Sequence, residues 1–158
     1  MAIYIKVGDI KGNVSAAGHE DWIECDSLQF GVGRAIPMMV GMETNREASH
    51  PSLSEVTVAK TMDDASPYLF QESVVGEAKE ILIHVTKTGA DQLESIVEYT
   101  LTSSLVSSYS MSSGGDRPSE SLSFAFTKIE MKYVVWDENH TQSSQVPVSY
   151  DLATAKAG

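Results

Sequence analysis

Residues 45–60, NREASHPSLSEVTVAK, run from a polar loop into a strand, and the interpretation of the chain starts from them. Val56 and Val58 alternate with Thr57 and Ala59, which is the period of a strand with one covered face. We therefore expect a strand at the end of this stretch and a loop before it.

The next stretch, residues 61–76 (TMDDASPYLFQESVVG), predicts a short helix directly after this strand. Ser66 is a favoured N-cap residue, and Pro67 suits the first helical position because an N–H there would have no partner within the helix. Gly76 ends the pattern, so the expected helix covers about 67–75. Helical spacing places three apolar side chains on its covered side: Leu69, Phe70 and Val74.

Period-two alternation dominates elsewhere and predicts antiparallel sheet. The long segment from Leu93 keeps apolar side chains on odd positions, which are Val97, Tyr99, Leu101 and Leu105. Two other segments change phase, near Asp26–Ser27 and near Thr127–Lys128, and a strand changes phase only at a bend or bulge. Strands that bend in this way let sheets curl. We therefore expect a mainly β fold, an antiparallel β-barrel of two curved sheets with one short α-helix on its side.

The chain length suits one domain over residues 1–158. A segment rich in Gly and Met, about 31–52, has neither strand nor helix period and predicts a long loop. The last residues, about 153–158, predict a flexible tail.

Composition excludes several classes of function. Eleven Lys and Arg residues against 22 Asp and Glu residues give a net charge of -11, which disfavours nucleic acid and anionic membranes as partners. No apolar run approaches the roughly 20 residues of a membrane span, and the amino terminus lacks the pattern of a signal peptide. Cys25 is the only cysteine, so no intramolecular disulfide forms, and we expect it in the core.

Catalytic and metal-binding patterns are missing from the sequence. The four histidines, His19, His50, His84 and His140, have no spacing typical of a metal site, and there is no nucleophile elbow or phosphate loop. His84 is predicted to lie mid-strand as a hydrogen-bonded structural residue. We predict that the protein is not an enzyme and uses no metal or cofactor.

Several segments in order resemble the Hcp family, the tube proteins of the bacterial type VI secretion system. They are the opening strand over 2–7, the stretches 18–24 and 28–34, and the loop, strand and helix over 45–70. Each segment alone is only a strand with a turn. Together, the segments cover most of the chain, and their order and spacing match those of the family. The resemblance implies a barrel that assembles with copies of itself into six-membered rings, which stack into a hollow tube.

The resemblance also implies partners and a location. A tip spike protein, a contractile sheath and secreted effectors would be partners, with the protein made in the bacterial cytoplasm and secreted without a signal peptide. A hollow tube needs one polar sheet face, and candidate positions that line the lumen and hold effectors are Gln29, Glu55, Thr57, Thr100 and Thr102.

The long loop supplies candidates for contacts between subunits or stacked rings. In Hcp-like proteins this loop extends toward a neighbouring subunit, and the candidate residues here are Met38, Met39, Met42, Arg46 and Glu47. The alternatives are a loop folded back over the barrel end and charges that are simply solvated.

Two other functions stay open at this point. A tail-tube protein of a contractile phage-like particle would share the barrel and the ring. A monomeric barrel that binds a small ligand would need an apolar interior pocket. We expect the interior to be filled instead, by Phe124, Phe126, Ile129 and Tyr133.

Overall fold

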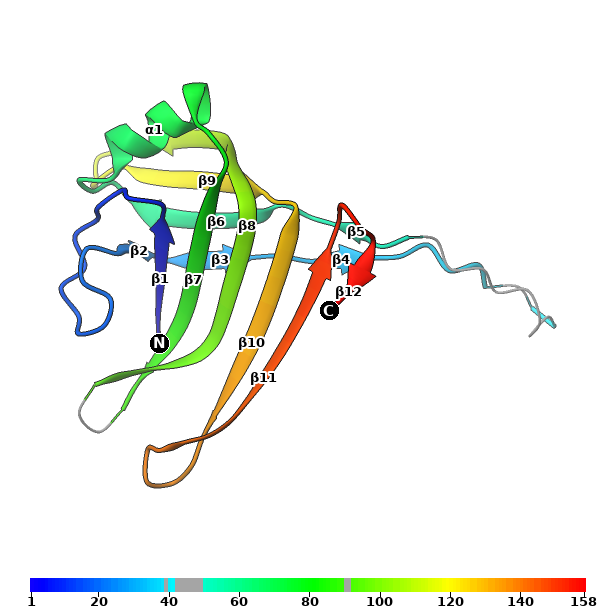
Figure 1. Ribbon diagram of the computed structural model, residues 1–158. Helices are drawn as coiled ribbons and strands as arrows, with labels where there is room; N and C mark the ends of the chain where they lie inside the picture. The colour runs from blue at the N-terminus through cyan, green and yellow to red at the C-terminus, as the bar shows by residue number, and fades with distance from the viewer. Residues whose placement is uncertain (39, 42–49, 90–91) are drawn as a thin grey trace.

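Antiparallel strands and one short helix make up the described part of this protein (Figure 1). The computed structural model describes residues 1–38, 40–41, 50–89 and 92–158. The predicted fold class, mainly β and antiparallel with one short helix, is confirmed. The strands are β1 (Ala2–Val7), β2 (Ile23–Cys25), β3 (Ser27–Gln29), β4 (Val32–Gly33), β5 (Ser52–Leu53), β6 (Val56–Thr61), β7 (Lys79–Thr88), β8 (Leu93–Ser112), β9 (Ser119–Ala125), β10 (Lys128–Trp136), β11 (Gln142–Asp151) and β12 (Lys156–Ala157), and the helix is α1 (Ser66–Val75).

Two curved layers share the long strand β8. The first sheet has the order β12-β11-β10-β8-β7-β1-β2, and its long strands run side by side in Figure 1. The second sheet has the order β3-β6-β9-β8. Pairing therefore runs in a circuit from β1 through the bent β2–β3 segment, β6, β9, β8 and β7 back to β1. This circuit is consistent with the expected barrel.

Both bends predicted from the sequence are present. Asp26 separates β2, which pairs with β1, from β3, which pairs with β6, and its N–H donates to the Ala59 carbonyl at 2.7 Å. Between β9 and β10, the Thr127 N–H donates to the Thr102 carbonyl at 3.1 Å. At each bend the chain passes from one sheet to the other.

A third bend, within β8, was not predicted. Ser103 has a φ of 50°, which interrupts the alternation, so that Leu101 is fully buried while Leu105 is 44% exposed. The prediction that Leu105 shares a face with Leu101 is therefore wrong. The side chains of Ser104 and Val106 turn inward instead.

Apolar side chains from both sheets fill the space between the layers. Residues of this core include Ile5, Ile23, Cys25, Val58, Ile83, Leu101, Leu122, Phe124 and Ile129. Cys25 is buried as expected, and burial raises the pKa of its thiol to about 12. Tyr133 is 48% exposed, so the prediction that it helps to fill the interior is wrong, because β10 extends beyond the second sheet at that point.

The helix packs against β8 and covers one end of the layers (Figure 1). It ends at Gly76 as predicted, and the Gly76 N–H donates to the Glu72 carbonyl at 3.0 Å. The predicted covered side is wrong in part. Leu69 is fully buried, but Phe70 is 56% and Val74 66% exposed. The Phe70 ring lies against Tyr109 instead of entering the core.

The carboxyl-terminal tail is paired and not free. Backbone hydrogen bonds of 3.0 Å join Ser149 and Gly158 in both directions, and β12 adds to the end of β11. Within the segment, about 153–158, for which a flexible tail was predicted, the structure thus places the two-residue strand β12 (Lys156–Ala157). Pro147 lies in β11, opposite Lys132 of β10, on the strand next to the sheet edge.

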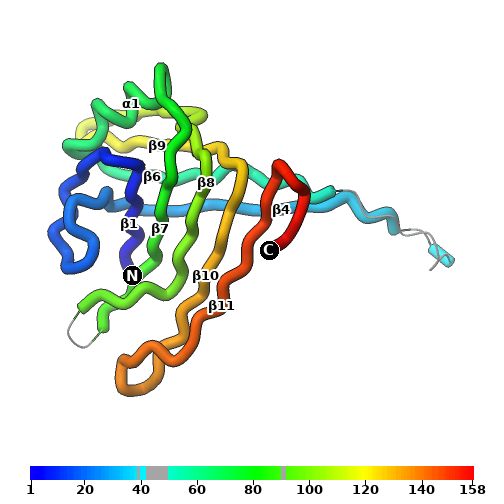
Figure 2. The backbone as a smooth tube through the Cα atoms, in the orientation of Figure 1, coloured from blue at the N-terminus to red at the C-terminus, as the bar shows by residue number. Residues whose placement is uncertain are grey.

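The long loop begins and ends in a small ribbon of β4 paired with β5. Its described residues beyond this ribbon project away from both sheets, as Figures 1 and 2 show. Within the described part of the chain, no helix has the length and apolar character that crossing a membrane requires.

Candidate functional site

The second sheet presents a face of short polar side chains. Gln29 pairs with Thr57, Thr57 with Ser123, and Ser123 with Ser108, so one register row crosses all four strands. Alternation repeats the pattern on either side of this row. We name this surface the polar face, and it consists of Ser27, Gln29, Thr57, Thr61, Ser108, Ser110, Ser112, Ser119, Ser121 and Ser123.

The polar face is accessible to solvent. Most of its side chains carry hydroxyl groups, and none of them is charged. Gln29 is exposed, and the Thr57 and Ser123 hydroxyls are 3.2 Å apart. At one end of the face, the Ser107 hydroxyl donates to the Glu55 carboxylate at 2.7 Å. These groups can exchange hydrogen bonds with water or with a passing surface, and the face offers no activated nucleophile.

The structure brings together three of the five predicted lumen residues. Gln29 and Thr57 lie in the same register row, and Glu55 precedes Thr57 by two residues on the same side. Thr100 and Thr102 do not join them. They lie on the first sheet, where Thr100 pairs with Leu82 and Glu130, and Thr102 pairs with Lys128.

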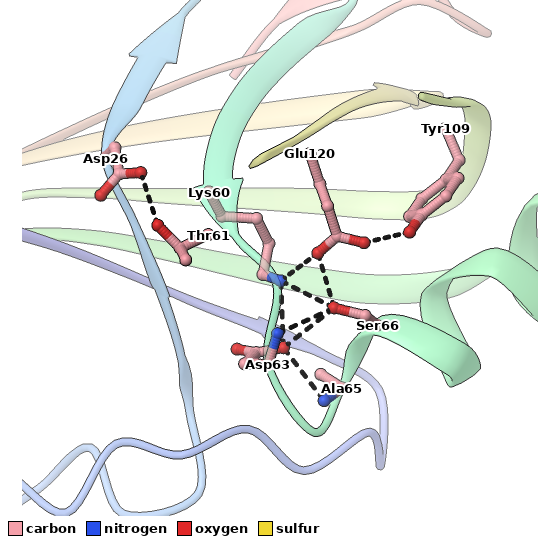
Figure 3. Close-up of polar contacts among 8 residues, drawn as sticks. All are labelled: Asp26, Lys60, Thr61, Asp63, Ala65, Ser66, Tyr109 and Glu120. Carbon is pink, nitrogen blue, oxygen red and sulfur yellow. Dashed lines mark hydrogen bonds and ion pairs between the residues drawn. The ribbon is translucent and has the colours of Figure 1, made fainter. Parts of the chain in front are cut away.

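A charged cluster lies under the opposite, core-facing side of the same sheet (Figure 3). Lys60 is fully buried, and its Nζ lies 2.6 Å from Glu120 Oε1, 3.0 Å from Asp63 Oδ1 and 3.2 Å from Ser66 Oγ. The Ser66 hydroxyl donates to Glu120 at 2.6 Å. We name Lys60, Asp63, Ser66, Tyr109 and Glu120 the buried cluster.

The buried cluster explains how the helix begins. Ser66 is the first helical residue and Ala65 is the N-cap, without a side-chain capping bond, so the prediction of Ser66 as N-cap is wrong. The Ser66 hydroxyl is used inside the cluster and also accepts from the Asp63 N–H at 3.0 Å. Asp63 Oδ1 accepts from the Ala65 N–H at 3.0 Å and stabilises the turn.

Hydrogen bonds shift the pKa values of Glu120 and Tyr109 in the buried cluster. Burial raises the pKa of Glu120, but hydrogen bonds from Lys60, Ser66 and Tyr109 to its carboxylate outweigh this effect and hold the pKa below the usual range. Burial, together with the hydrogen bond to Glu120, raises the pKa of Tyr109 to about 12. Glu120 is therefore a carboxylate and Tyr109 a neutral phenol at neutral pH.

A signal for this cluster exists in the sequence. Lys60 follows Val56 and Val58 on the covered side of its strand, and Glu120 precedes Leu122 and Phe124 in the same way. Two opposite charges at covered positions of paired strands predict a buried ion pair. The ion pair was not predicted from the sequence, because only the apolar positions of these two strands were used to assign their covered sides.

The histidines form one pair that their spacing in the sequence does not reveal. His19 Nε2 and His84 Nδ1 are 2.9 Å apart, and the rings of Tyr4 and Trp22 pack around them. Burial lowers the pKa of both histidines. His84 is thus a hydrogen-bonded mid-strand residue, as predicted. Within the described ranges, no three His, Cys, Asp or Glu side chains are grouped to hold a metal ion.

The predicted contact residues of the loop fall mostly outside the described part of the chain. Met38 is described and is 85% exposed. The other four, Met39, Met42, Arg46 and Glu47, lie outside the described residues.

Comparison with known proteins decides the family. A family model described as "Type VI secretion system effector, Hcp" matches residues 4–133, which is most of the chain. The chain belongs to the Hcp family. This confirms the resemblance stated from the sequence segments. A search of curated protein sequences found no match.

Solved structures share the fold over most or nearly all of the chain. A structure described as a type six secretion system protein is 27% identical, with a TM-score of 0.90 and coverage of 99% of both chains. Hcp1 from Salmonella typhimurium is 22% identical, with a TM-score of 0.80 over 99% of this chain and 98% of that chain. A chain of the anti-feeding prophage baseplate has a more distantly similar fold. It is 11% identical with a TM-score of 0.52, over 82% of this chain and 90% of that chain.

Proposed function

We propose that this chain is a structural component of the type VI secretion inner tube, which forms stacked six-membered rings and carries effectors through their lumen. The Hcp family match over residues 4–133 is the observation that carries this proposal. A sheet with an uncharged polar outer face and a filled inner face suits the wall of a water-filled channel.

The polar face is the proposed lumen surface. It places Gln29 and Thr57 side by side, with Glu55 at its edge, and these three residues are the proposed effector contacts. Thr100 and Thr102, on the first sheet, are the weaker candidates because they lie apart from this group. Short hydroxyl side chains hold a cargo loosely, since each hydrogen bond to it replaces one to water.

The proposed partners follow from the family. They are further copies of this chain, a tip spike protein, a contractile sheath and secreted effectors, and the protein itself would be secreted after synthesis in the bacterial cytoplasm. The role is structural and involves no catalysis, metal or cofactor. The loop residues Met38, Met39, Met42, Arg46 and Glu47 stay the proposed contacts between subunits or rings.

Solution mass tests the assembly. We expect light scattering on a size-exclusion column to give six times the chain mass of 17.1 kDa, and negative-stain images of that peak to show annular particles. A single-chain mass at every concentration, also in the presence of a tip protein, would contradict the proposal.

Effector retention tests the lumen assignment. Gln29→Arg places a long cation in the polar face and should abolish co-purification of an effector while the ring mass stays unchanged. Gln145→Arg is the matched control, because Gln145 is an exposed strand residue of the first sheet. Equal effector recovery from Gln29→Arg and from the control would remove the cargo role of Gln29.

The phage-like alternative is supported by the fold of the anti-feeding prophage baseplate component. A tail-tube protein would form the same ring, so mass alone does not separate the two functions. Secretion does. Release of this protein from intact cells by a type VI apparatus supports the first proposal, and its retention in sedimenting particles after lysis supports the alternative.

A monomeric ligand-binding barrel is the weakest alternative. Leu122, Phe124 and Leu101 are fully buried and occupy the space where a ligand would bind. Such a protein would also show a single-chain mass, which the light-scattering measurement detects.

A further inference from the structure

Aromatic side chains gather on the outer side of the first sheet. Tyr4 of β1 and His84 of β7 pair in register and point away from the core, because the neighbouring residues on both strands belong to it. His19 and Trp22, from the connection between β1 and β2, pack on this pair with distances of 4.6–5.1 Å between ring centroids. Tyr4, His19 and Trp22 are buried. We name the four side chains the aromatic anchor.

His19 attaches a short turn to the sheet. Within residues 15–21, all of which the structure describes, His19 is the only buried residue. Backbone hydrogen bonds close the turn on itself, since the His19 N–H donates to the Ala16 carbonyl at 2.9 Å and the Asp21 N–H donates to the Val14 carbonyl at 2.8 Å. The attachment of residues 15–21 to the sheet therefore depends on the His19 ring.

The contact between the two histidine rings holds one hydrogen. His19 Nε2 and His84 Nδ1 are 2.9 Å apart, so one nitrogen must donate and the other must accept. Two neutral rings satisfy this condition, and so does one protonated ring beside a neutral one. Two protonated rings do not, because each would direct an N–H and a positive charge at the other. The contact therefore tolerates a first proton and breaks with the second.

A nearby carboxylate favours the first proton. Glu98 Oε1 of β8 lies 3.9 Å from His84 Nε2, and Glu98 Oε2 lies 2.7 Å from Lys132 Nζ of β10. Lys132 thus offsets part of the attraction between Glu98 and a protonated His84. The charge of one proton is balanced in this way, and Glu98 is already shared when a second proton arrives.

Two other titratable groups lie close to His19. Glu20 follows it in the chain and is exposed, so water and salt weaken its effect on the ring. Burial raises the pKa of Tyr4, so this phenol stays neutral in acid. Neither group supplies a buried negative charge for a second proton.

We infer that the aromatic anchor is sensitive to acid. It holds residues 15–21 on the first sheet while the two histidine rings share one hydrogen, and it releases them once both rings are protonated. This inference goes beyond the proposed function, because it concerns a single chain and holds with or without assembly. Release exposes Trp22 to water, so the change is directly measurable.

The direction of the pH dependence follows from burial. Burial lowers the pKa of both His19 and His84 in the folded protein. The attachment is therefore complete above the unfolded-state pKa of about 6.5 and is lost as the pH falls through the lower folded-state values. Acid, and not alkali, frees the turn.

Tryptophan quenching tests the release. All samples carry Trp136→Phe, which leaves Trp22 as the only tryptophan. Between pH 7.5 and pH 4, the quenching constant of Trp22 with acrylamide should rise about threefold as residues 15–21 leave the sheet. Circular dichroism at each pH restricts the comparison to folded protein.

A pair of amides provides the matched control. His19→Gln combined with His84→Asn keeps a donor and an acceptor at the contact, but amides take up no proton in this pH range. The quenching constant of this double variant should stay within about 1.3-fold between the two pH values. His50→Gln removes an exposed histidine outside the anchor and should leave the rise unchanged.

Three results would overturn the inference. One is a quenching constant that does not rise in acid, and another is an equal rise in the double variant, which would assign the release to other groups. Nitrogen-15 NMR of the histidine rings gives the third and does not need the double variant to fold. If His19 and His84 titrate independently at the ordinary pKa of about 6.5, they share no hydrogen. A single-chain mass at neutral pH would instead contradict the tube proposal and leave this inference standing.

Discussion

The two faces of the second sheet both carry polar side chains, in surroundings that differ in exposure to solvent. On one side, Gln29, Thr57 and Ser123 are accessible to solvent and exchange hydrogen bonds with water. On the other, Lys60 and Glu120 are enclosed between the sheet and the helix, and their partners are other side chains. Burial and charge therefore distinguish a solvated surface from a cluster that holds the fold together.

Removing the buried cation should have the largest effect. Lys60→Met leaves Glu120 and Asp63 without their ammonium partner and should lower the free energy of unfolding by about 3–5 kcal/mol. Urea unfolding measures this. If Lys60→Met unfolds at the same urea concentration as the unmodified protein, Lys60 does not stabilise the fold. That result would contradict the distinction between the two faces of the second sheet.

A double substitution sharpens the same point. Lys60→Met combined with Glu120→Leu removes both charges together, so the loss should be smaller than the sum of the two single losses. Strict additivity would contradict a direct interaction between Lys60 and Glu120.

Neutralising the carboxylate should have the next largest effect and should depend on pH. Glu120→Gln should cost about 2–3 kcal/mol at pH 7, because hydrogen bonds to a charged acceptor become bonds to a neutral one. The pKa of Glu120 is lowered in the folded state. Its contribution is therefore complete above the unfolded-state pKa of about 4.3 and is lost as the pH falls through the lower folded-state value.

Unfolding curves at several pH values measure this dependence. The stability difference between the unmodified protein and Glu120→Gln should shrink as the solution is acidified. A difference that grows on acidification would mean that the folded state raises the pKa of Glu120.

Removing the phenol should have a smaller effect. Tyr109→Phe deletes one hydrogen bond to Glu120 and should cost about 1.5 kcal/mol at pH 7. The pKa of Tyr109 is raised to about 12, so this contribution is complete below the usual value of about 10 and is lost as the pH rises toward 12. Thermal unfolding at neutral pH measures the loss. An unchanged melting temperature would exclude the bond.

Changes on the polar face should barely affect stability. Thr57→Val removes a hydroxyl that is 3.2 Å from Ser123 and accessible to water, so the free energy of unfolding should change by less than about 0.5 kcal/mol. Effector recovery should fall because the face loses a hydrogen-bonding group. A stability loss as large as that of Lys60→Met would show that the two faces are not distinct.

Much of the fold is predictable from alternation. The bends at Asp26 and Thr127 were located because apolar residues change phase there, and the strand over 56–60 and the end of the helix at Gly76 followed from local patterns. The bend at Ser103 was missed because flanking serines and threonines tolerate either face, so the phase change leaves little trace in the sequence.

The candidate site was predictable only in part, because it depends on pairing between distant strands. Gln29 and Thr57 come together through the pairing of β3 with β6, and Thr100 is separated from them because the first half of β8 belongs to the other sheet. The ion pair of Lys60 and Glu120 spans 60 residues of sequence. Alternation assigns each residue a side of its strand but does not say which strands are neighbours.

The position of Gln29 in the assembled ring tests the account most directly. Gln29→Cys protein labelled with a small gold particle should show the gold at the centre of annular particles in electron micrographs. Gln145→Cys, at an exposed position of the first sheet, should show it away from the centre. Cys25 is buried and its thiol has a pKa of about 12, so it should stay unlabelled. Gold on the outer rim for Gln29→Cys would contradict the assignment of the polar face to the lumen.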